Sequence, residues 1–159
     1  MLFSLVGMSL YIYYLNNKKL VVSTDNMSPT IKAGDTVRVK VGAYIFSSIE
    51  RFDIVVFKAP EEYRLQEKSP NMVFVNRVIG FPDEKVEIKS GVVFINDYPL
   101  TELYVANKSQ DNFGPYKIPL NEFFFLGDNR PNSWDSRFWK KPTIPEDDLV
   151  GKVLEVIPK

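Results

Sequence analysis

After the first twenty residues, hydrophobic and polar positions alternate in short runs bounded by turn residues. A period of two is typical of half-buried β-strands. Residues 35–41 show it most clearly, with Val37, Val39 and Val41 on one face. Residues 52–58 form a fuller apolar run, which favours a strand covered on both sides. The pattern therefore predicts a mainly β domain.

Other runs extend the predicted sheet. Further strands are predicted at 72–80, 84–89, 92–96, 122–128 and 150–157. Ser90 and Gly91 separate two of these runs, and a two-residue turn with glycine favours a β-hairpin because glycine readily supplies positive φ. We interpret the polar stretch of about 97–120 as a smaller β-hairpin excursion from the main sheet, and residues 61–71 as a solvated surface loop.

The N-terminal segment has a different pattern. Residues 1–15 carry no charged side chain and precede two asparagines and two lysines. As a helix they would reach about 22 Å, which is short for a bilayer core of about 30 Å. We predict a short N-terminal membrane helix, with 1–19 as the anchor and 20–159 as the β domain. The only positive charges near the helix are the lysines that follow it, and the positive-inside rule would place them in the cytoplasm. Charge bias alone therefore does not fix the orientation of the helix.

Three alternatives for this segment stay open. A cleavable signal peptide normally has a basic start and an Ala-x-Ala-like exit, and neither is visible here. A buried core helix would show polar residues on one face. A helix lying in the membrane interface would carry a charged face, which this segment lacks.

Composition narrows the chemistry. The chain of 159 residues is 45% hydrophobic and 14% aromatic, enough for the core of one domain. Twenty basic and twenty acidic residues cancel without long runs of one sign, so nucleic acid is not expected as a partner. Without cysteine or histidine, disulfides, the usual zinc ligands and histidine-based triads are excluded. Carboxylate pairs or a serine with a lysine base remain, and no metal or cofactor is implied.

Two segments are candidates for a site. Residues 26–30, "NMSPT", favour a turn, because Asn26 and Ser28 form local hydrogen bonds and Pro29 blocks a helix. Residues 127–137, "GDNRPNSWDSR", follow an apolar run and hold two each of Asp, Arg, Ser and Asn. Bidentate Asp–Arg pairs there can hold a backbone rigidly. The alternative for this second segment is an ordinary salt-bridged loop.

The order of four segments resembles the bacterial type I signal peptidases, which are membrane-anchored Ser/Lys proteases. The resemblance runs from about residue 22 to 156 and implies a signal-peptidase-like β-sheet domain. The last family motif, G-D-N-R-x-x-S-x-D-S-R, is matched at Gly127, Asp128, Asn129, Arg130, Ser133, Asp135, Ser136 and Arg137. The first motif is matched at Met27, Pro29 and Thr30, and the third from Arg77 onward. The chain departs from the family pattern at Phe52, in place of glycine, and at residues 82–84, in place of Pro-Gly-Asp.

The resemblance also implies a mechanism. In the family, a serine of the first motif attacks the scissile carbonyl, and a buried lysine of the third motif, with a lowered pKa, takes its proton. In this chain Asn26 stands at the serine position and Asn76 at the lysine position. An amide offers neither a nucleophile nor a useful base. Ser133 corresponds to the serine that orients the lysine, and Thr24 lies on the oxyanion side.

We therefore predict a protein that keeps the fold and groove but does not cleave. It would bind an extended peptide by strand addition and have a binding or regulatory role. Expected partners are the membrane, signal peptides of preproteins or an active paralogue. The expected location is the bacterial cytoplasmic membrane, crossed once, with the soluble domain on the outer, extracytoplasmic face.

Two alternative functions stay open. One is an active signal peptidase with an atypical pair, for which Ser28 and Lys85 are the nearest substitutes, or a form inactivated by engineering. A weaker one is a self-cleaving Ser/Lys repressor-type protease. The main hypothesis places Asn26 near the start of the first strand and Asn76 on a central strand. Their side chains should face each other in a groove close to Ser133.

Overall fold

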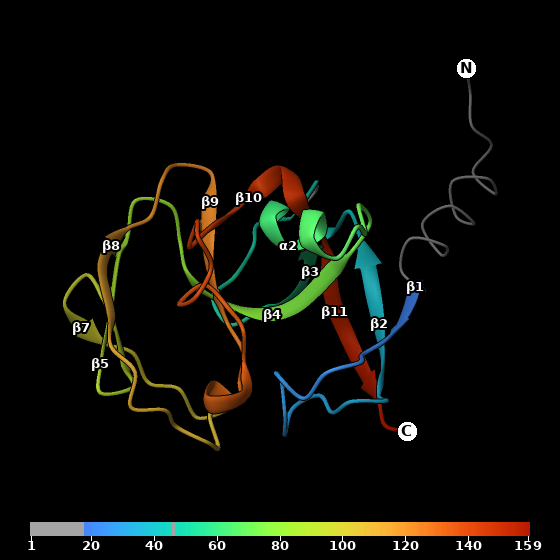
Figure 1. The fold of residues 1–159 in the computed structure, drawn as a ribbon, viewed down its shortest axis with the longest axis horizontal. Coiled ribbons are helices and arrows are strands. Elements are labelled where there is room, and N and C mark those ends of the chain that lie inside the picture. The colour runs from blue at the N-terminus through green and yellow to red at the C-terminus, as the bar shows by residue number, and fades with distance from the viewer. Residues whose placement is uncertain (1–17, 46) are drawn as a thin grey trace.

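The computed structural model describes residues 18–45 and 47–159, which form two antiparallel sheets (Figure 1). The larger sheet has seven strands in the order β1-β2-β11-β3-β4-β9-β10. Their bounds are β1 Lys18–Val21, β2 Thr36–Val41, β3 Ile54–Lys58, β4 Val73–Gly80, β9 Glu122–Leu126, β10 Ile144–Pro145 and β11 Leu149–Ile157. The mainly β prediction is confirmed, and most alternating runs coincide with these strands.

The smaller sheet has four strands in the order β7-β6-β5-β8. They are β5 Lys85–Lys89, β6 Val92–Ile95, β7 Tyr98–Pro99 and β8 Phe113–Lys117. Ser90 and Gly91 connect β5 to β6, both with positive φ, as the predicted hairpin requires. The sheet is wider than the predicted excursion of 97–120: β8 returns to pair with β5, so the second sheet begins at Lys85.

The first described strand lies where the anchor was expected to end. Lys18 and Lys19 belong to β1 and pair with Val39 and Arg38 of β2. Both lysine side chains are exposed, so an extended backbone pairs with β2 while the charges stay in water. The rest of the predicted anchor, 1–17, lies outside the described residues. Within the described part of the chain, no helix is both long and apolar enough to span a bilayer.

One predicted loop is partly helical. Glu61–Gln66 forms α2, within the 61–71 stretch predicted as a surface loop. Pro60 precedes it, and two glutamates in the first turn favour a helix there because acidic groups stabilise the positive end of the helix dipole. The other short helices are 3₁₀ turns at Ala43–Ile45 (η1), Arg130–Asn132 (η2) and Glu146–Asp148 (η3).

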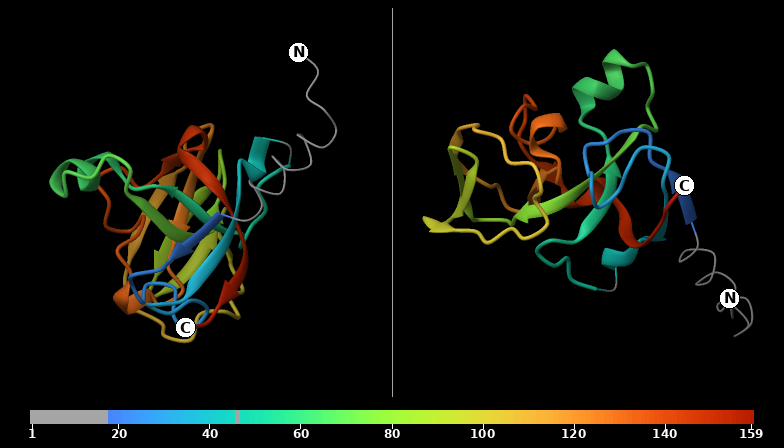
Figure 2. Two further views of the ribbon diagram at one scale, coloured as in Figure 1. Left: turned by 90° about the vertical axis from the view of Figure 1, so that its right-hand side faces the viewer. Right: turned by 90° about the horizontal axis from the view of Figure 1, so that it is seen from below.

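β9, a strand of the larger sheet, contributes side chains to two hydrophobic cores. Phe124 and Leu126 of β9 pack with the buried residues of the smaller sheet, whereas Phe123 and Phe125 pack with Phe57. Alternate side chains of one strand thus fill cores on its two faces. Figure 1 shows the smaller sheet on one side of β9 and the strands β4, β3 and β11 of the larger sheet on the other. The right-hand view of Figure 2 shows part of the segment after β9 between the two sheets.

Candidate functional site

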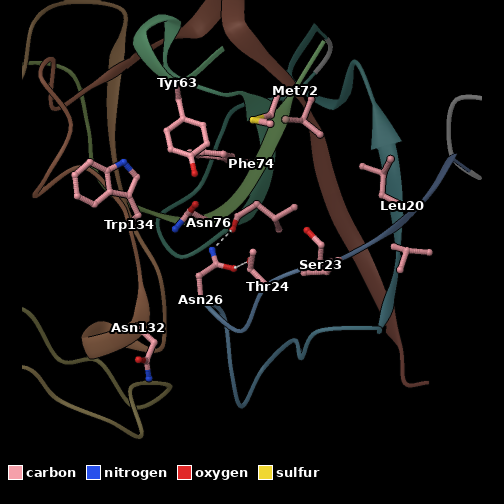
Figure 3. A pocket seen from close by; sticks show the side chains of 14 residues that line it. Leu20, Ser23, Thr24, Asn26, Tyr63, Met72, Phe74, Asn76, Asn132 and Trp134 are labelled. Atoms are coloured by element: carbon pink, nitrogen blue, oxygen red, sulfur yellow. Dashed lines mark hydrogen bonds between the residues drawn. The ribbon is translucent and has the colours of Figure 1, made fainter. Parts of the chain in front are cut away.

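A groove of about 400 Å³ opens beside β4, and both Asn26 and Asn76 line it (Figure 3). Its walls come from the end of β1 and the following residues, from Met72 and the first half of β4, from α2, and from η2 and the segment after it. They are Leu20, Val21, Val22, Ser23, Thr24, Asn26, Tyr63, Met72, Val73, Phe74, Val75, Asn76, Asn132 and Trp134. None of these described wall residues carries a charged side chain, so the groove favours an uncharged ligand.

Asn26 lies in the turn between β1 and β2, not near the start of a strand as predicted. The turn is closed by backbone hydrogen bonds, in which Ser28 donates to Asp25 and Ile31 donates to Met27. Met27 is fully buried and fixes the turn to the core, whereas Pro29 is exposed. A turn, rather than a strand, therefore presents Asn26 to the groove.

Both ends of the Asn26 side chain are occupied. Its Nδ2 donates to the carbonyl of Val75 at 2.9 Å, and its Oδ1 accepts from Thr24 Oγ1 at 2.6 Å. Thr24, the residue predicted on the oxyanion side, thus orients Asn26. Each amide end takes one good partner, which holds the side chain in a single orientation.

Asn76 lies on β4, an interior strand of the larger sheet, as predicted, and is 1% exposed. Turned over from the orientation drawn in Figure 3, its amide donates to the Val75 carbonyl at 3.0 Å and accepts from the Gly127 N–H at 3.1 Å. Because the amide nitrogens of Asn26 and Asn76 then share one acceptor, they lie at most about 6 Å apart. The two side chains therefore face each other in the groove, where the motif alignment expected them.

The groove runs along an open strand edge. Within the described chain, β9 pairs with β4 only from Arg77 onward, so Val73–Val75 have no strand on that side. The carbonyl of Val75 faces this edge, since it accepts from Asn26. Backbone groups alternate in direction along a strand, so those of Val73 face the same edge. The groove is thus bordered by an open strand edge with unpaired backbone groups.

Gly127 allows Ser133 and the backbone of Asn26 to approach each other closely. A Cβ at this position would lie 2.2 Å from Ser133 Oγ and 2.5 Å from the carbonyl oxygen of Asn26. Only glycine fits at this approach. Gly127 also brings Ser133 beside Asn76, because both side chains lie against it. Ser133 is buried, and its Oγ has no hydrogen-bond partner among the described residues.

Asp128 joins the three family motifs that the resemblance identified. It is fully buried and accepts two hydrogen bonds from Arg77, at 2.8 and 2.6 Å. Thr30 Oγ1 donates to the same carboxylate at 2.6 Å. A third bond runs from Arg77 to the carbonyl of Phe52. The carboxylate therefore holds the turn that carries Asn26 against β4, which carries Asn76.

The other polar residues of segment 127–137 form hydrogen bonds and an ion pair that hold the backbone of this loop and of the first-motif turn. The backbone N–H of Asn129 donates to the Asn26 carbonyl, and its side-chain amide donates to the Asp25 carbonyl, each at 3.0 Å. Asp135 pairs with Arg137 at 2.8 Å, and the Ser136 hydroxyl accepts from the N–H of Phe125 at 2.9 Å. The expected Asp–Arg pairing is present within this loop. The turn of the first motif is held by Asp128 and Asn129 of the same segment.

The connection between β7 and β8 contributes residues that sequence reasoning missed. Glu102 accepts from Arg130 at 2.5 Å, and the Tyr104 hydroxyl donates to Glu102 at 2.7 Å. The guanidinium of Arg77 lies 4.0 Å from the Tyr104 ring centroid. Burial, followed by the charge and hydrogen bond of Glu102, raises the pKa of Tyr104 well above its usual value. The hydroxyl therefore stays protonated and remains a donor.

The predicted substitutes for the catalytic pair lie elsewhere. Neither Ser28 nor Lys85 is among the described residues that line the groove. Lys85 lies in β5 and pairs with Asp97 at 2.6 Å. The groove-lining hydroxyls are those of Ser23, Thr24 and Tyr63. Among the described residues, no three His, Cys, Asp or Glu side chains are grouped so that they could hold a metal ion.

Comparison with known proteins identifies the family. The model of the family "Signal peptidase, peptidase S26" matches residues 1–157. The chain belongs to the signal peptidase family. A signal peptidase I crystal structure from Enterococcus faecalis is similar in fold, with a TM-score of 0.56 and 28% identity over 69% of this chain and 98% of that one. The resemblance inferred from the sequence motifs is thereby confirmed.

Several relatives carry the same family name. The chain is 38% identical over 133 residues to signal peptidase I of Leptolyngbya laminosa, covering 84% of this chain and 64% of the relative. It is 34% identical to probable signal peptidase I-1 of Synechocystis, covering 84% and 67%. With the chloroplastic thylakoidal processing peptidase 1 of Arabidopsis thaliana it shares 36% identity, covering 87% and 41%. The chain thus spans between 41% and 67% of the length of these three relatives.

Proposed function

We propose that this member of the signal peptidase family binds peptides in its groove without cleaving them. Asn26 and Asn76 stand at the positions to which the resemblance assigns the nucleophile and the base. A carboxamide has no hydroxyl to activate and does not take up a proton near neutral pH. The observation that carries this proposal is the pair of amides meeting at the Val75 carbonyl.

The surroundings of Asn76 support the proposal that this position once held the lysine of the family pattern. Buried polar groups in proteins almost always have a hydrogen-bond partner, yet the Ser133 hydroxyl has none among the described residues. In the family pattern this serine would orient the lysine base. An asparagine side chain is shorter than a lysine and makes its bonds with Val75 and Gly127 instead. Ser133 is therefore left without the group that it would orient.

The groove retains what peptide binding requires. Val73–Val75 present an open strand edge, and the described wall residues are uncharged. A peptide that adds as a strand gains main-chain hydrogen bonds along the edge and places alternate side chains in the groove. The ligand class that fits is an extended, apolar segment such as the signal peptide of a preprotein.

The proposal includes a place in the cell. Residues 1–19 contain the apolar N-terminal segment, which we propose crosses the bacterial cytoplasmic membrane once. The β domain would lie on the outer face, where signal peptides are exposed. Its role would be binding or regulation, with preproteins or an active paralogue as partners.

A cleavage assay tests the proposal. The full chain and the double variant Asn26→Ser plus Asn76→Lys are compared on a signal-peptide substrate, with Asn76→Lys alone as the control. We expect cleavage by the double variant and none by the parent or the control. If the parent cuts, the proposal is wrong, and Ser23→Ala would show whether the groove-lining Ser23 is the nucleophile. If none cuts, binding of a labelled signal peptide to the parent decides whether the groove is functional.

A further inference from the structure

Three aromatic side chains form a corner at one end of the groove. The aromatic corner consists of Tyr63 from α2, Phe74 from β4 and Trp134 from the segment after η2, all of which line the groove. The rings of Tyr63 and Phe74 meet edge to face with centroids 5.2 Å apart. Figure 3 shows Tyr63 and Trp134 flanking the space above Asn76, with the Tyr63 hydroxyl directed towards Asn76.

The aromatic corner is held from outside the groove. The Trp134 ring stacks on Phe138, with centroids 5.4 Å apart and planes inclined by 13°. α2 is fixed at its base, where Arg64 donates to the Ala59 carbonyl, and its Glu62 accepts from the Lys140 N–H, each at 2.9 Å. Side chains held in this way bind a ligand without a large loss of conformational freedom.

Trp134 is nevertheless 53% exposed, and Tyr63 is half-buried. Exposed aromatic faces beside an open strand edge gain most from contact with another aromatic or large apolar side chain. A small side chain would leave these faces in water. A charged side chain would be desolvated without an opposite charge among the described wall residues.

We propose that the aromatic corner selects an extended peptide carrying an aromatic or large aliphatic side chain next to the segment that pairs with β4. The inference rests on the proposed peptide binding and adds the ligand class. The peptide backbone pairs with Val73 and Val75, and its bulky side chain packs between Tyr63 and Trp134. Tyr63 and Trp134 are then specificity-determining residues.

A peptide panel tests the inference on the full chain in detergent. A labelled, uncharged peptide is scanned with alanine, leucine, phenylalanine and lysine at each position, and Kd is measured by fluorescence polarisation. We expect one position at which phenylalanine binds about tenfold tighter than alanine and lysine binds worst. Tyr63→Ala and Trp134→Ala should each remove most of that preference, whereas Tyr63→Phe should keep it.

Leu65→Ala is the matched control, because Leu65 also lies on α2 but is 70% exposed and is not among the described wall residues. It should leave the preference unchanged. Peptides that bind equally well with alanine and phenylalanine at every position would overturn the aromatic corner while leaving peptide binding intact. A preference that survives in both alanine variants would place the selective contact elsewhere. If no peptide binds at all, the proposed function fails as well.

Discussion

The side-chain amide of Asn26 donates a hydrogen bond to the backbone carbonyl of Val75, 49 residues further along the chain. The bond fills one backbone acceptor on the open edge of β4. A serine at this position would not reach as far, and the carbonyl would be left for a ligand. The asparagine therefore ties the first-motif turn to β4 and would compete with the proposed peptide for the same edge.

Removing that amide should strengthen peptide binding. In Asn26→Ala the Val75 carbonyl loses one of its two donors and becomes available to a peptide N–H. One hydrogen bond of this kind corresponds to a change of about twofold to tenfold in Kd. Asn132→Ala is the control, because Asn132 also lines the groove but its side-chain amide donates to Asn129 rather than to β4. Weaker binding by Asn26→Ala would show that Asn26 contacts the peptide itself.

Asp128→Ala should unfold the site. The variant leaves the buried guanidinium of Arg77 without its carboxylate and releases Thr30. Removing one partner of a buried ion pair costs about 3–5 kcal/mol in the free energy of unfolding. Urea denaturation measures this change. Asp97→Asn removes one charge of the exposed pair with Lys85 and keeps a residue type that tolerates the positive φ at this position, so it should change the free energy by less than about 0.5 kcal/mol. Equal effects of the two variants would contradict the role of Asp128.

Ser133→Ala should behave differently in two backgrounds. In the parent chain the hydroxyl makes no hydrogen bond with described residues, so its removal should leave the free energy of unfolding unchanged or slightly higher. In the double variant Asn26→Ser plus Asn76→Lys, the same change should lower kcat, because the introduced lysine loses the group that orients it. A loss of stability in the parent would mean that Ser133 has a partner there.

Gly127→Ala should distort the contact between the turn and the loop. The new Cβ would meet Ser133 Oγ and the Asn26 carbonyl well inside contact distance. Overpacking of this kind costs about 1–3 kcal/mol, which thermal or urea unfolding can detect. Adding Ser133→Ala should relieve the variant only in part, because the Asn26 carbonyl and the Ser133 Cβ stay close. Full recovery would locate the whole conflict at the hydroxyl.

Alkaline pH should destabilise the fold through two tyrosines. Burial raises the pKa of both Tyr44 and Tyr104, helped by the carboxylates of Asp53 and Glu102. In the unfolded chain both titrate near pH 10. Above about pH 10 the unfolded chain therefore releases protons that the folded chain keeps, and the free energy of unfolding falls as pH rises. The double variant Tyr44→Phe plus Tyr104→Phe should show a shallower fall in urea titrations. An unchanged slope would contradict the raised pKa values.

Local sequence patterns predicted the features that depend on neighbouring residues. Alternation located β2, a fuller apolar run located β3, and the Ser90–Gly91 turn was predicted because its backbone needs positive φ. The motif spacing also placed Asn26 and Asn76 in one groove. These features follow from the periodicity of apolar residues, from the residue types that turns require, and from the order of the family motifs along the chain.

The features missed by sequence analysis depend on contacts between distant residues. α2 spans six residues, too few for a helical period to appear in the sequence. Tyr63 could therefore not be placed at the groove. Glu102 reaches Arg130 from 28 residues away, and nothing in the polar stretch that contains it signals a partner. Trp134 was visible within the last motif, but only the fold shows that it faces the groove rather than the core.

The bonds that hold the Asn26 turn span almost the whole length of the domain. Asn129 binds the Asp25 carbonyl across 104 residues, and Asp128 binds Thr30 across 98. Because a chain emerges from the ribosome with its N-terminus first, the turn is made early but receives its fixing partners late. A growing chain thus carries Asn26 long before the groove exists. The peptide binding proposed above would therefore require synthesis to have passed Trp134, which lies furthest along the chain of the described wall residues.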